Sequence, residues 1–162
     1  MIKGEPAERV AENAFTFEEF LANEAKAGRL NLPLKKIADR ALVHGHCHTK
    51  AFGVAPALLE ALALIPGAQP KMIESSCCGM AGSFGYEATH YEVAMKMAEA
   101  SLLPKVRAAE ADTLIVADGT SCRHQIHDGA QREAIHVARV LAQALALPVS
   151  APDRFAHGVI GQ

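Results

Sequence analysis

The chain has 162 residues, of which 50% are hydrophobic and only 5% aromatic, with no tryptophan. This length fits one ordinary domain, and its core must be built from Ala, Leu, Val and Ile. Sixteen Lys and Arg against eighteen Asp and Glu give a net charge of −2, which argues against a nucleic-acid binder, because such proteins carry a basic excess.

The sequence predicts a chain without a membrane-spanning segment, since no apolar run approaches the roughly 20 residues that a bilayer requires. The opening residues, MIKGEPAERVAE, lack the apolar stretch of a signal peptide. Four cysteines and eight histidines in such a chain predict reduced thiols and a metal site rather than a disulfide scaffold. The expected location is the cytoplasm, and any association with a membrane surface would come through partners.

Residues 1–40 are predicted to form an N-terminal helical segment. Thr16 and Glu19 have the spacing of a capping box, so a helix should begin at residue 17. Gly28 is placed to end this helix. Its predicted apolar face comprises Phe17, Phe20 and Leu21.

The region 41–147 alternates short apolar runs with helical patterns, and we expect it to form the main domain. Strands are predicted at 41–43, 71–73 and 113–117. Helices are predicted at 56–64, 87–100, 102–111 and 131–145. The alternation predicts an α/β fold, with a short parallel sheet of three to four strands flanked by helices. Residues 148–162 are expected to be a loosely held C-terminal tail.

The cysteines fall at equivalent places in this pattern. Cys47 follows the first predicted strand, Cys77 and Cys78 follow the second, and Cys122 follows the third. Because parallel strands end at the same edge of a sheet, where ligands bind in open α/β folds, the four thiols should converge there. The spacing therefore predicts one cofactor site.

Residues around the cysteines suit an anionic group. Lys50 and Arg123 would add positive charge beside a thiolate-bound cofactor. Three imidazoles are candidates for alternative ligands or for donors to the ligands, namely His46, His48 and His124. Five glycines would let the backbone approach a bulky group, namely Gly45, Gly79, Gly82, Gly85 and Gly119.

Three stretches carry a family resemblance: HGHCHTKA (44–51), SSCCGMAGSFGYE (75–87) and ADGTSCRHQI (117–126). They resemble the cysteine-rich CCG domain that occurs in heterodisulfide reductase, in the iron–sulfur subunits of glycolate and lactate oxidases, and in anaerobic glycerol-3-phosphate dehydrogenase. The similarity is greatest to the C-terminal domain of large FAD-linked oxidases.

The resemblance implies an iron–sulfur electron-transfer module of an FAD-linked oxidoreductase that acts on a 2-hydroxy acid. A [4Fe–4S] cluster would be held by Cys47, Cys77, Cys78 and Cys122. The flavin would lie on a separate domain or subunit, which is the expected partner. No catalytic residue is assigned, and the chain is not expected to turn over substrate alone.

One position departs from the fuller family pattern, which ends in Cys-x-x-Cys. Gln125 stands where the last cysteine would be, so five-thiol ligation is not expected. Two alternatives to the iron–sulfur reading remain open. One is a zinc-binding structural or docking module. The other is a metal-free thiol redox module.

Overall fold

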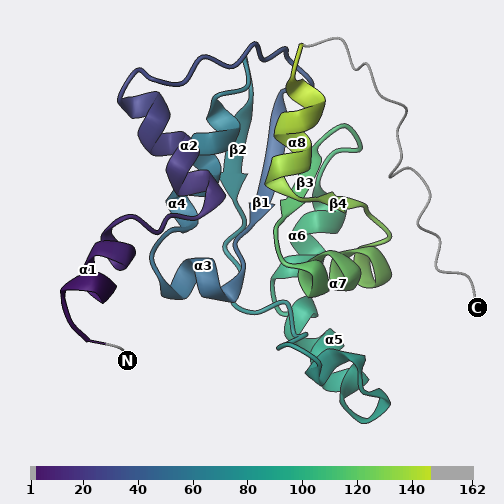
Figure 1. Ribbon diagram of the computed structural model, residues 1–162. Coiled ribbons are helices and arrows are strands. Elements are labelled where there is room, and N and C mark those ends of the chain that lie inside the picture. Colours follow the sequence, from purple (N-terminus) through teal and green to yellow (C-terminus); the bar gives the residue numbers. More distant parts are fainter. Residues whose placement is uncertain (1–2, 147–162) are drawn as a thin grey trace, which may run out of the picture.

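The computed structural model describes residues 3–146 and forms an α/β fold, as predicted (Figure 1). The predicted tail, 148–162, lies outside the described residues. The helices are α1 (Glu5–Glu12), α2 (Phe17–Lys26), α3 (Cys47–Ala51), α4 (Ala55–Ala63), α5 (Tyr91–Glu99), α6 (Leu102–Ala108), α7 (Thr120–Ala130) and α8 (Val137–Ala144). The strands are β1 (Arg40–His44), β2 (Gln69–Met72), β3 (Leu114–Ala117) and β4 (Ala134–Ile135). Two short 3₁₀ turns precede α5: η1 (Phe84–Tyr86) and η2 (Ala88–His90).

The four strands form one parallel sheet in the order β2-β1-β3-β4. The chain leaves β1 toward β2 on one side and later returns to place β3 on the other side. The carboxyl ends of β1 and β3 therefore flank the point where the direction of winding reverses. In open α/β sheets this switch point is where ligands bind.

Side chains alternate across the two central strands, so each face of the sheet has its own apolar layer. Ala41, Val43 and Val116 pack under α2, α4 and α8. Ile115 and Ala117 pack with α5, α6 and α7 on the opposite face. Both faces are thus covered, which fits the apolar character of β1 and β3.

The boundaries predicted for α2 are confirmed, but its predicted apolar face is not. Thr16 and Glu19 form the capping box at the start of α2. Gly28, at φ +67°, follows its end. However, Phe17 and Phe20 are 46% and 51% exposed, and the buried residues are Glu18, Leu21 and Ala22. The face that packs against α4 is therefore narrower than the one predicted, with both aromatic rings at its margin.

The single helix predicted at 131–145 is wrong. The chain leaves α7 at Gln131, whose φ of +52° is left-handed, and then forms β4 before α8 begins at Val137. β4 has only two residues, Ala134 and Ile135, paired with Ile115 and Val116 of β3. So short a strand leaves no periodic signal, and only its hydrogen bonds to β3 define it.

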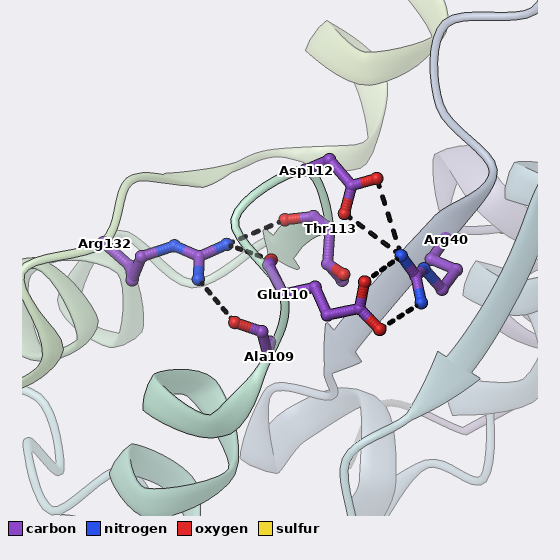
Figure 2. Close-up of polar contacts among 6 residues, drawn as sticks. All are labelled: Arg40, Ala109, Glu110, Asp112, Thr113 and Arg132. Carbon is purple, nitrogen blue, oxygen red and sulfur yellow. Dashed lines mark hydrogen bonds and ion pairs between the residues drawn. The ribbon is translucent and has the colours of Figure 1, made fainter.

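A polar network ties the connections together at the amino end of the sheet (Figure 2). Arg40, the first residue of β1, pairs with both carboxylate oxygens of Glu110 and with Asp112. Arg132 donates to the backbone carbonyls of Ala109, Glu110 and Thr113 at 3.1, 3.2 and 2.9 Å. These contacts fix the loop between α6 and β3 at the end of the sheet opposite the cysteines.

Among residues 3–146, no helix has both the length and the apolar character needed to cross a bilayer.

Candidate metal centre

The four cysteines stand beyond the carboxyl ends of β1, β2 and β3, as their spacing predicts. Cys47 is the first residue of α3, which lies directly beyond β1 in Figure 1. Cys77 and Cys78 occupy the loop after β2, and Cys122 lies in the first turn of α7. Cys47 and Cys122 thus lie at helix starts rather than in open loops.

The buried pair is Cys78 and Cys122, which are 3% and 1% exposed. Their sulfurs lie 3.3 Å apart, with Cys122 Sγ donating. This hydrogen bond is the main reason that the pKa of Cys78 is lowered to about 4, against the effect of burial. The same contact, reinforced by burial, raises the pKa of Cys122 far above its usual value. The contact therefore favours the thiolate form of Cys78 over that of Cys122.

The outer pair is Cys47 and Cys77. Cys47 is exposed and Cys77 half-buried. Burial and then the charge of Cys77 raise the pKa of the Cys47 thiol. Gly79 donates its backbone N–H to Cys77 Sγ at 3.2 Å. The charges of Cys47 and Cys77 also raise the pKa of Cys122. In the described part of the chain, neither belongs to the group of possible metal ligands that contains Cys78 and Cys122.

His44, the last residue of β1, lies beside the two buried sulfurs. A ring nitrogen of His44 and the sulfurs of Cys78 and Cys122 lie within 4.8 Å of one another. Sequence reasoning included His44 in a motif but did not select it as a site residue. The available signal was its place at the end of a buried strand, directly before the cysteine loop.

The three histidines selected from the sequence have other contacts. His46 caps α3, with Nδ1 accepting from the backbone N–H of His48, and burial lowers its pKa. His48 is exposed, with its ring centroid 4.9 Å from that of His46. Nδ1 of the exposed His124 lies 2.8 Å from the hydroxyl of Tyr86. None of the three belongs to the group that His44 forms with Cys78 and Cys122 in the described part of the chain.

The two basic residues tie loops together. Lys50 Nζ donates to the carbonyls of Ser75 and Ser76 at 2.6 and 3.0 Å, so it holds the loop after β2 against α3. Its charge also lowers the pKa of Cys47, as a minor effect. Arg123 donates to the carbonyls of Ala117 and Asp118, which fixes the turn between β3 and α7.

The glycines of these loops allow close approach of protein atoms. A Cβ on Gly79, which has φ +88°, would lie 2.1 Å from the backbone oxygen of Ala94 in α5. One on Gly119 would lie 2.5 Å from the His46 ring and 2.9 Å from Cys122 Sγ. For the others, a Cβ on Gly85 would meet Met80, one on Gly45 would meet Lys50, and one on Gly82 would meet nothing within 4 Å. The absence of a side chain at Gly79 and Gly119 thus allows α5 and α3 to pack closely against the cysteine loops.

Gln125, which stands where the family pattern has its last cysteine, is buried at 4% exposure. Its Nε2 donates to Ala94 O at 3.1 Å. The side chain therefore holds α5 against α7, in the same contact that Gly79 permits.

The donor set suits a metal that prefers sulfur. Thiolate and imidazole ligands are typical of zinc and of iron–sulfur centres. His44 is fully buried, and its Nε2 has no hydrogen-bond partner among the described residues. A buried nitrogen without a partner beside two sulfurs fits a site that holds a metal.

The chain is similar to one dehydrogenase subunit, to one dehydrogenase and to a lactate utilization protein. It is 34% identical over 115 residues to one subunit of the anaerobic glycerol-3-phosphate dehydrogenase of Escherichia coli, covering 71% of this chain and 28% of the relative. It is 32% identical over 113 residues to the D-2-hydroxyglutarate dehydrogenase of the same species, covering 68% of this chain and 11% of the relative. It is 29% identical over 148 residues to lactate utilization protein A of Bacillus licheniformis, covering 85% of this chain and 58% of the relative.

The chain thus spans only part of each of these relatives, and less than a third of both dehydrogenase proteins. No family model matches the sequence. No solved structure matches it either. The relatives are consistent with the CCG-type resemblance and include the glycerol-3-phosphate dehydrogenase that it names.

Proposed function

We propose that the chain is an electron-transfer module of a larger dehydrogenase and that Cys47, Cys77, Cys78 and Cys122 hold an iron–sulfur centre. The observation that carries the proposal is that each of the four cysteines follows one of three neighbouring parallel strands, with Cys78 and Cys122 in contact. Relatives named as dehydrogenase components support the redox role.

When bound, a [4Fe–4S] cluster supplies one-electron transfer at a potential set by its surroundings. The chain's own residues would hold the cluster and shape those surroundings. The backbone N–H of Gly79 already donates to a cysteine sulfur, and hydrogen bonds of this kind tune such centres. The buried Cys78 and Cys122 would exclude water from one side, while Cys47 is exposed.

The partner and substrate follow from the relatives and the family resemblance. The names of two relatives refer to 2-hydroxy acids, hydroxyglutarate and lactate. The proposed partner is therefore a flavin-containing domain or subunit that oxidises a 2-hydroxy acid and passes its electrons to this module. The proposed location is the cytoplasm.

A second candidate is a zinc module, favoured by the close spacing of the buried pair. Two thiolates on one tetrahedral zinc, at about 2.3 Å each, lie about 3.8 Å apart. The 3.3 Å between Cys78 and Cys122, with His44 nearby, is near that value. Zinc would make this edge of the sheet a structural or docking site.

The test is the metal and sulfide content of protein purified without oxygen and reconstituted with iron and sulfide. The electron-transfer proposal expects about four iron and four sulfide per chain. Cys78→Ser should abolish uptake and leave the circular dichroism spectrum unchanged. Ser76→Ala, two residues away with an exposed side chain, is the matched control and should load normally.

Each other outcome identifies a different function. Tight zinc with less than one iron per chain would replace the proposal with the zinc module. A reversible disulfide without bound metal would favour the thiol redox reading. Unfolding of Cys78→Ser would show that the cysteines are primarily structural.

A further inference from the structure

His44 lies where a ligand of the metal centre would be expected, although no sequence pattern selected it. It ends β1 and pairs in register with Ala117 at the end of β3, on the two strands that flank the switch point. Alternation along β1 places its side chain opposite Ala41 and Val43, on the face that carries Cys78 and Cys122. The ring is fully buried.

The hydrogen bonds of the ring determine which nitrogen is available. His44 Nδ1 lies 2.9 Å from Ser75 Oγ, and the Ser75 hydroxyl donates to Ile73 O at 3.5 Å. In the tautomer with the ring proton on Nδ1, this nitrogen donates to Ser75 Oγ. In that tautomer Nε2 carries the lone pair that a metal would bind.

That lone pair has no donor in the described part of the chain, although it is completely shielded from water. Buried polar atoms are nearly always paired, so an unpaired one needs an explanation. A metal-bound histidine has the same division of roles, because one nitrogen donates to an oxygen while the other binds the metal.

The geometry points to His44 Nε2 as a direct ligand of the metal centre, beside Cys78 and Cys122, with Ser75 as the positioning residue. This inference rests on the proposed function, because it requires a metal or cluster at this edge of the sheet. It changes the expected ligand set from four cysteines to three cysteines and one histidine. Lys50 contributes indirectly, because its hydrogen bond to Ser75 O holds the Ser75 backbone in place.

The experiment uses the full chain with all histidines labelled with ¹⁵N, loaded without oxygen with iron and sulfide or with Co²⁺ alone. Pulsed electron paramagnetic resonance of the reduced cluster, or of the Co²⁺ form, should show the strong coupling of a directly bound nitrogen. The coupling should disappear in His44→Ala and remain in His124→Ala, whose ring is exposed and bonded to Tyr86.

Ser75 is tested by its effect on affinity and on the same signal. Removing the partner that orients a metal-bound histidine lowers metal affinity by roughly 10–100-fold. Ser75→Ala should therefore weaken Co²⁺ binding by about that factor and alter the nitrogen coupling, while Ser75→Thr restores both. A purely structural serine would change folding without moving the coupling.

The possible failures can be told apart. If the unsubstituted chain loads metal but shows no bound-nitrogen coupling, the assignment of His44 is overturned even if His44→Ala fails to fold. The assignment is also overturned if the coupling persists in a folded His44→Ala. If the chain takes up neither the cluster nor Co²⁺, the proposed function fails and the assignment fails with it.

Discussion

Adding one methyl group at Gly79 should separate the cysteine loop from α5. Gly79 has φ +88°, where an L-residue other than glycine costs about 1–2 kcal/mol. Its Cβ would lie 2.1 Å from Ala94 O, so loop and helix must move apart by about 1 Å. Overpacking of this kind costs a further 1–3 kcal/mol, roughly. The same movement would strain the bond from Gln125 to Ala94 O.

Gly82 provides a matched control within the same loop. It has a similar backbone, with φ +70°, but a Cβ there would meet nothing within 4 Å. Gly82→Ala should therefore lower the free energy of unfolding only by the cost of the left-handed backbone, about 1–2 kcal/mol. Gly79→Ala should lose about 2–5 kcal/mol in total.

The assay is urea denaturation of the metal-free proteins in reductant, followed by circular dichroism. Keeping metal out matters, because a ligand bound only to the folded state would add its own stabilisation. Equal losses of unfolding free energy for Gly79→Ala and Gly82→Ala would refute the reasoning, since the two differ only in the predicted clash.

Three further substitutions test contacts elsewhere in the fold by the same denaturation assay. Thr16→Ala breaks the capping box of α2 and should lower the free energy of unfolding by about 1 kcal/mol. Arg132→Ala removes the side-chain donor to three backbone carbonyls, of which that of Glu110 also accepts from Thr113 N–H, and should cost about 2 kcal/mol. Glu18→Gln should raise the free energy of unfolding at pH 7, because burial raises the pKa of Glu18 and thus penalises its ionised form in the folded protein. The gain should shrink as the pH falls through the raised pKa and vanish below 4.5, the ordinary pKa, where the carboxyl is neutral in both states.

Controls separate each effect from a general loss of stability. Thr16→Ser keeps the capping oxygen and should match the unsubstituted chain. Arg132→Lys should recover only part of the loss, because an ammonium cannot reproduce the forked geometry. Glu92→Gln removes a charge from an exposed position and should have little effect. A Thr16→Ser as unstable as Thr16→Ala, a full recovery in Arg132→Lys, or a pH-independent gain in Glu18→Gln would contradict the respective argument.

Local sequence signals were sufficient for much of the fold. The alternation of apolar runs and helical patterns predicted the parallel sheet, and Thr16 and Gly28 predicted both ends of α2. These features depend on neighbouring residues along the chain. Local signals failed for β4, whose two residues become a strand only through pairing with β3.

The candidate site was also predicted in part. The position of each cysteine after a strand predicted their convergence, because parallel strands end at a common edge. Which residues contact one another was beyond that argument. His46 and His124 lie near cysteines in the sequence. In the structure, however, His46 caps α3 and His124 is hydrogen-bonded to Tyr86.

The sequence by itself thus determined the class of fold, the edge where the cysteines gather and the kind of chemistry that thiols permit. Its signals are periodicity and the order of the elements, and these act along the chain. Only the tertiary structure decided that Cys78 pairs with Cys122 and that His44 joins them. The physical reason is that side-chain direction depends on strand register and on the packing of α5 and α7. Both of these depend on contacts between segments that are distant in the sequence.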